Sequence, residues 1–264
     1  MIKIAPPAAA LLLVLPALAG AAPPGLNLRW DQCYADGGVQ NRTFACNTNL
    51  GVDELLMSFV LPQDMPDVSG NEIVLKIQSA SATLPSWWDF KLAGACRQSS
   101  LSLSTGFHAG AVNCVDWSNG LATGGIGSYQ AGFAGPNTAR LAIAIAVAPP
   151  EFPALLAGQE YISCALNINH AKSVGSGACP GCDQPTCLAF EQLLVTTPVA
   201  ADNVRVTGGA NAPDSEFVRW QNGLATDVSF ECHVMSGCTH TFSCVDASTP
   251  THNSTWGAVK ALYR

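Results

Sequence analysis

The densest group of side chains able to do chemistry lies in residues 232–244, where two histidines stand among three cysteines: Cys232, His233, Cys238, His240 and Cys244. Thiolates and imidazoles are the ligands that zinc and copper prefer. The spacing matches no familiar zinc module, however, and the cysteines of an exported chain usually pair with one another. We therefore expect disulfides here, with a metal site on the same five residues as the alternative.

A second group contains Cys179, Cys182 and Cys187, and Cys179-Pro180-Gly181-Cys182 has the spacing of a redox dithiol. A redox dithiol gains reactivity at a helix N-terminus, which lowers the thiol pKa. This one lies in a loop rich in Gly and Pro between two expected strands, so a structural role is favoured. The cysteines expected to form disulfides are Cys33, Cys46, Cys96, Cys114, Cys179, Cys182, Cys187, Cys232, Cys238 and Cys244.

Closure of short loops favours the pairs Cys33 with Cys46 and Cys96 with Cys114. The chain has 11 cysteines, so one is left over. Cys164 points inward on its expected strand, and we expect it to be a buried free thiol.

Trp87 and Trp88 are adjacent. On a strand their rings would face opposite sides, so one ring would be exposed and able to stack on a sugar or on a side chain of a partner protein. The alternative is that both rings pack in the core. These two residues are the sequence's candidates for binding a carbohydrate or a surface protein.

Familiar catalytic motifs are absent. No serine has glycine two residues to either side, and there is no His-Glu-x-x-His helix or Gly-rich phosphate loop. We expect no catalytic activity and no cofactor. A secreted hydrolase acting on polysaccharide or peptide through carboxylates in separate loops is the alternative, because such pairs leave no local spacing.

For the isolated histidines and the acidic residues, the sequence favours structural roles. His108 and His170 have no metal ligands or catalytic partners near them in the sequence. The acidic residues of the N-terminal third form no calcium-binding loop, and we expect them to be solvated: Asp31, Asp36, Asp53, Glu54, Asp64 and Asp67.

Composition and the N-terminus indicate export. Residues 1–22 are apolar except for Lys3 and end in small residues, which is typical of a signal peptide. No later stretch reaches the roughly 18 apolar residues of a membrane span. The net charge of −7 leaves no basic surface for nucleic acid. The sequence thus predicts a secreted chain in the extracellular space, on the cell surface or in the periplasm.

Apolar residues alternate with polar ones in two segments. Ile73, Leu75 and Ile77 form one stripe, and the other consists of Ile162, Cys164, Leu166 and Ile168. Loop signals rich in Gly and Asn separate these and other short apolar runs. The pattern predicts an all-β protein, an antiparallel β-sandwich of the immunoglobulin or jelly-roll type braced by disulfides. We place it in residues 23–223, followed by a Cys/His-rich extension over 224–264 that ends in a short amphipathic helix from Ser254 to Arg264.

Three segments of the chain resemble segments of other proteins: residues 27–33, 84–90 and 255–264. In these the chain resembles a group of uncharacterised secreted proteins of environmental bacteria. The resemblance implies export and a β-rich fold, and it implies no activity, ligand or catalytic residue. The sequence therefore predicts a structural or binding module without catalytic activity.

Overall fold

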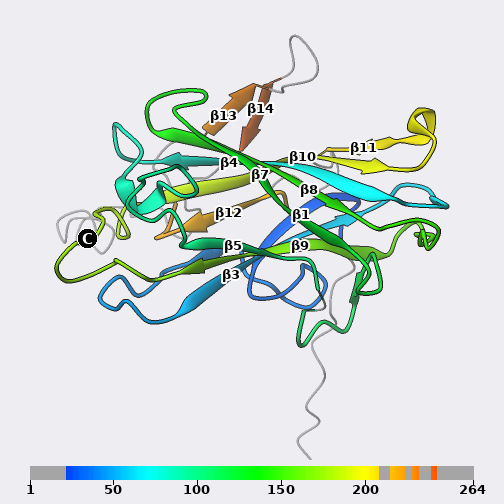
Figure 1. Cartoon of the computed structure of the whole chain (residues 1–264), viewed down its shortest axis with the longest axis horizontal. Coiled ribbons are helices and arrows are strands. Elements are labelled where there is room, and N and C mark those ends of the chain that lie inside the picture. Colours follow the sequence, from blue (N-terminus) through cyan, green and yellow to red (C-terminus); the bar gives the residue numbers. More distant parts are fainter. Residues whose placement is uncertain (1–21, 107, 208–214, 224–227, 232–238, 243–264) are drawn as a thin grey trace, which may run out of the picture.

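The computed structural model describes residues 22–106, 108–207, 215–223, 228–231 and 239–242. Within them the chain folds as an antiparallel β-sandwich, as the sequence predicts (Figure 1). The helical elements of this part are two single 3₁₀ turns, η1 (Ser86–Trp88) and η2 (Ala200–Asp202). Neither is long enough to cross a membrane.

The first sheet has the order β1-β3-β9-β5, with β6 parallel to β9. Its strands are β1 (Gly25–Trp30), β3 (Val52–Val60), β5 (Leu101–Ser104), β6 (Cys114–Asp116) and β9 (Glu160–Asn169).

The second sheet has the order β2-β12-β10-β4-β8-β7, with β11 added on β10. Its strands are β2 (Asn41–Arg42), β4 (Gly70–Ser79), β7 (Thr123–Ala131), β8 (Thr138–Ala146), β10 (Thr186–Thr196), β11 (Val204–Val206) and β12 (Phe217–Trp220). A separate hairpin pairs β13 (Val228–Glu231) with β14 (Thr239–Phe242).

The apolar stripes of the two sheets meet in one core. The stripe Ile73, Leu75 and Ile77 on β4 is buried there, as predicted. The opposite face of β4 is wet only at its ends, where Glu72 is exposed and Gln78 partly buried. In the middle Lys76 is buried and forms an ion pair with Glu191 at 2.5 Å. Burial of both faces in the middle of β4 fits its position inside the sheet, between β10 and β8.

On β9 the predicted alternation fails at one residue. Cys164, Leu166 and Ile168 enter the main core, but Ile162 packs on the outer face of the sheet. The cause is a register shift opposite Met57 and Ser58, which adds one residue to β9 and reverses the side chains that precede it. Cys164 is a buried free thiol, as expected.

The two ends of the sandwich differ. Loops 61–69, 147–159 and 197–203 lie together at what we call the open end (Figure 1, right). Hydrogen bonds hold them: Met65 and Leu155 exchange both backbone bonds at 2.8 Å, and the Ser69 amide donates to the carbonyl of Thr196, the last residue of β10. Loops 43–51, 80–100 and 170–185 lie at the opposite end, which we call the disulfide end (Figure 1, left).

Disulfides hold the second of these ends. Cys46–Cys182 and Cys96–Cys179 both join its loops, and Cys33–Cys114 closes the outer face of the first sheet. Cys187 is disulfide-bonded as well. The local pairs predicted from the sequence, Cys33 with Cys46 and Cys96 with Cys114, are wrong, because the folded sheets bring together cysteines 81 to 136 residues apart.

Several sequence predictions fall outside the described residues. They include residues 1–21 of the predicted signal peptide, of which only residue 22 is described, and the predicted C-terminal helix from Ser254. Cys232, His233, Cys238 and Cys244 are also outside, and His240 is described only as a position of β14.

Candidate functional site

Trp87 and Trp88 are fully buried, so the predicted exposed ring is not there. They lie on the η1 turn rather than on a strand, and both rings contact Trp220, with centroids 4.8 and 5.2 Å away. The guanidinium of Arg97 lies 3.6 Å from the centroid of the Trp87 ring. Neither tryptophan is accessible to a sugar, so both residues belong to the aromatic core under the disulfide end.

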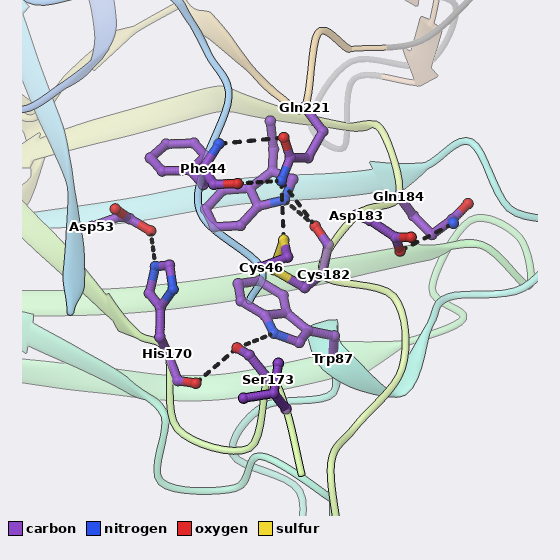
Figure 2. Close-up of a disulfide and its surroundings, with 12 residues drawn as sticks. Phe44, Cys46, Asp53, Trp87, His170, Ser173, Cys182, Asp183, Gln184 and Gln221 are labelled. Atoms are coloured by element: carbon purple, nitrogen blue, oxygen red, sulfur yellow. Dashed lines mark hydrogen bonds and ion pairs between the residues drawn. A yellow bond between two sulfur atoms is a disulfide. The ribbon is translucent and has the colours of Figure 1, made fainter. Parts of the chain in front are cut away.

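The disulfide end is built on this aromatic core (Figure 2). The Gln221 amide donates to the carbonyl of Phe44 at 2.9 Å and lies 3.1 Å from the sulfur of Cys46. The Trp87 indole donates to the hydroxyl of Ser173 at 3.0 Å. Cys179 and Cys182 bond to different partners, so the Cys-x-x-Cys segment is not a redox dithiol in this structure.

Two buried histidines pair with neighbouring carboxylates of β3. His170 Nε2 lies 2.5 Å from Asp53, and His108 Nδ1 lies 3.0 Å from Glu54. Asp53 is therefore not the solvated charge that the sequence suggested, and burial raises the pKa of its carboxyl group. Sequence reasoning missed both pairs, because each histidine is more than fifty positions from its carboxylate.

A histidine hydrogen-bonded to a carboxylate supplies two members of a hydrolytic triad. The third is a nucleophile, such as a serine hydroxyl, that hydrogen-bonds to the second ring nitrogen. Here His170 Nδ1 and His108 Nε2 are buried, and neither has a hydrogen-bond partner among the residues that the structure describes. The hydroxyl of Ser173 donates to the backbone carbonyl of His170 instead of facing the ring. Neither pair is therefore arranged as a triad, and burial of both rings suits a structural role.

Glu160 is a third buried carboxylate, beside the Cys33–Cys114 disulfide. It accepts hydrogen bonds from the Ser58 hydroxyl at 2.5 Å and from the amides of Tyr34 and Ala35 at 3.1 and 2.8 Å. The two sulfurs are bonded to each other, so neither supplies a thiolate for a metal. The carboxylate instead fixes the backbone of the Cys33 loop.

Burial raises the pKa of Glu160 above its ordinary value of 4.5. Between the two pKa values the folded state holds a proton that the unfolded state has released. The contribution of Glu160 to stability is therefore complete below about pH 4.5 and is lost as the pH rises through the raised pKa. We expect the free energy of unfolding of the wild type, relative to a Glu160→Gln variant, to fall over this range. Urea titrations from pH 4 to pH 8 measure it. Glu151→Gln, at an exposed position, is the control. If the free energy of unfolding of the wild type minus that of Glu160→Gln stays constant or increases with pH, the pKa of Glu160 is not raised.

The open end holds a recess of about 460 Å³ between loops 61–69 and 197–203. Asp64, Asp67 and Asp202 line it, and the buried side chain of Met65 lies among them. Two other recesses of the described residues are more open, and one includes Pro149 and Phe152 and the other Pro24 and Pro62.

No local pattern groups these residues, because Asp202 is more than 130 positions from Asp64 in the sequence. The loops 61–69, 147–159 and 197–203 contain four acidic residues and no Lys or Arg. The loops of the disulfide end carry Lys91, Arg97 and Lys172. Charge is therefore unevenly distributed between the two ends, and the recess lies at the acidic one.

No protein-family model matches the chain, and no curated protein matches it. Among solved structures, the chain is similar to the second type II cohesin module of the cellulosomal adaptor ScaA scaffoldin of Acetivibrio cellulolyticus. The TM-score is 0.29 and the identity 10%, over 70% of this chain and 90% of that one. A likeness this low assigns no function to the chain.

The acidic recess is thus the best candidate for a binding site in the described residues. Recesses of this size are typical of sites that hold a small ligand or a partner's side chain. It is lined by three carboxylates, which can bind a charge, and by Met65 and Val204, which can contact an aliphatic group.

Proposed function

We propose that this protein is an exported, non-catalytic binding module whose open end recognises a lysine or arginine side chain of a partner protein. The observation that carries the proposal is the recess with Asp64, Asp67 and Asp202 around Met65. Export is supported by the apolar N-terminal segment and by the disulfides, which persist in oxidising compartments.

The chemistry of the recess favours a cation on an aliphatic stem. Lysine and arginine carry a charged group at the end of a chain that packs on apolar surface. Met65 and the partly buried Val204 offer that surface, and the aspartates offer the charge. The residues that line the recess include no aromatic ring on which a sugar could stack, so a protein is favoured over a carbohydrate.

The loops around the recess are held in place before any ligand arrives. The Asp64 carboxylate accepts a hydrogen bond from the Ala157 amide at 2.7 Å, and the Asn203 side chain accepts one from the Thr197 amide at 2.9 Å. Together with the Met65–Leu155 bridge, these bonds reduce the ordering cost of binding. Asp67 and Asp202 are exposed and contribute no such bond in the described part of the chain, so a ligand can bind their carboxylates at little structural cost.

The test compares two fluorescent peptides that alternate glycine with either lysine or norleucine, which has a similar stem and no charge. We expect the lysine peptide to bind more tightly, and added salt to weaken it. A double variant, Asp67→Asn with Asp202→Asn, should weaken binding roughly fivefold to tenfold, because each removes one exposed charge contact.

Asp183→Asn is the matched control, since Asp183 is an exposed aspartate at the disulfide end. Its binding should equal that of the wild type. Equal binding of the norleucine peptide, or equal losses in the control and the double variant, contradicts recognition of a cation by the recess.

A further inference from the structure

Cys187 on β10 is disulfide-bonded, and the choice of its partner follows from the cysteine count. The chain has 11 cysteines. The three bridges between described residues use six of them, and Cys164 is free. The cysteines that remain for Cys187 all lie in the Cys/His-rich extension: Cys232, Cys238 and Cys244. A bond from Cys187 to any of them ties this extension to the second sheet.

The register of the β13–β14 hairpin distinguishes these three cysteines. Its pairs run from Val228 with Phe242 to Glu231 with Thr239. Continued by one position, this ladder places Cys232 opposite Cys238. Opposite residues of an antiparallel pair have Cα atoms about 4.5 to 5.5 Å apart, which is within the span of a disulfide. Cys244 follows the end of β14 and is left for Cys187.

The outer face of the second sheet is buried around Cys187. Residues paired across neighbouring strands share a face, so Ala189 lies on the same face as Phe217 of β12 and Lys76 of β4. Cys187, Ala189, Phe217 and Lys76 are all buried. The first three belong neither to the main core nor to the smaller cluster around Cys33. They are therefore buried against something other than the first sheet.

This burial is local, and it includes a charged pair. Further along the same sheet, Ala144 and Ala146 of β8 are exposed. Over β4, by contrast, Lys76 is 2% exposed and forms its ion pair with Glu191. The outer face of an antiparallel sheet commonly meets water. A further segment of protein is needed to exclude water from the middle of this one.

The β13–β14 hairpin suits this role. It follows β12 after a short connection, residues 221–227, and consecutive elements usually lie side by side. A two-stranded hairpin is marginally stable on its own. By register, positions 228, 230 and 242 share one face and hold Val, Phe and Phe, whereas the positions of the other face hold mainly Ser, Thr and Glu. Such a hairpin needs an apolar surface to pack on, and Ala189 and Phe217 offer one.

We propose that residues 224–244 cover the outer face of β4, β10 and β12, held there by a Cys187–Cys244 disulfide, and that a Cys232–Cys238 disulfide closes the hairpin. The first part of the extension then belongs to the sandwich and is not a separate appendage. Both bridges together use all three cysteines of the extension. The zinc or copper site considered from the sequence would therefore lack its thiolates.

Peptide mapping of the non-reduced protein tests the pairing. Cleavage before aspartate and after aromatic residues places Cys187 on peptide 183–190 and Cys244 on peptide 243–245. We expect a disulfide between these two peptides and an internal disulfide in peptide 231–242. Alkylation of the denatured, non-reduced protein should label one cysteine per chain, Cys164. A bond between peptides 183–190 and 231–242, or a second labelled cysteine, overturns the pairing.

The rate at which Lys76 reacts with an amine-acylating ester tests the cover. In the wild type this rate should be low, because Lys76 is buried. Replacing both Cys187 and Cys244 with serine should raise the rate at least about fivefold, because a segment without its cross-link opens more often. Exposed Lys91 is the internal reference, and its rate should stay the same.

A second double variant, with Cys232 and Cys238 replaced by serine, is the matched control. It removes one bridge from the same segment but keeps the bond to Cys187, so Lys76 should react as slowly as in the wild type. Equal acceleration in the two double variants, or acceleration in neither, overturns the cover by residues 224–244. None of these outcomes depends on the acidic recess.

Discussion

Replacing Cys46 and Cys182 with serine should lower the free energy of unfolding by about 5 kcal/mol, because the disulfide closes a loop of 136 residues. The bridge restricts the unfolded chain, and the loss grows with the logarithm of loop length. The loss should appear as a lower midpoint in urea, with the same slope if the folded state keeps its compactness.

Cys164→Ser is the natural control, because Cys164 is a free thiol. Its substitution removes no cross-link and should cost much less than loss of the bridge. If the double serine variant is as stable as the wild type, the Cys46–Cys182 bridge does not brace the disulfide end.

Replacing Arg97 with methionine should lower the free energy of unfolding by about 3 to 5 kcal/mol. Arg97 is 1% exposed and donates to the backbone carbonyls of Trp87 at 2.8 Å, Ala171 at 3.1 Å and Asn169. Methionine fills part of the volume but supplies no donor, so these carbonyls lose their partner. Burial already lowers the pKa of Arg97 to about 9, and these hydrogen bonds offset the cost of burying its charge.

Arg205→Met provides the comparison, since Arg205 is exposed on β11. It should leave the unfolding midpoint nearly unchanged. Equal effects of the two substitutions would show that Arg97 does not organise the loops of the disulfide end. Lost near-ultraviolet circular dichroism from the surrounding tryptophans should accompany the Arg97 effect.

The strand architecture could be predicted because alternation is a local signal. Ile73, Leu75 and Ile77 are three residues of one strand, and their inward face follows from the pleat alone. Cys164 was also predictable as a buried thiol from its place in such a stripe. Ile162 was not, because the shifted register beside it is set by pairing with β3.

Contacts between distant segments were not predictable from a single sequence. Loop closure alone favours Cys33 with Cys46, yet the topology places Cys33 beside Cys114 and Cys46 beside Cys182. Trp87 and Trp88 read as strand residues, whereas the structure puts them on a 3₁₀ turn under Trp220.

The acidic recess shows the same limit. Asp64 and Asp67 were recognised as acidic residues without a calcium loop, but nothing local pairs them with Asp202. They come together because β3, β4 and β10 all end or begin at one end of the sandwich. A further signal was present in the sequence, since three loops at this end contain no Lys or Arg.

The most direct test of the account is a map of amide chemical shifts of the purified protein during titration with N-acetyl-lysine amide. We expect changes confined to residues 61–69 and 197–203, with no comparable change for N-acetyl-norleucine amide. Changes centred on loops 80–100 and 170–185, or equal changes with both compounds, would contradict binding of a cationic side chain at the open end.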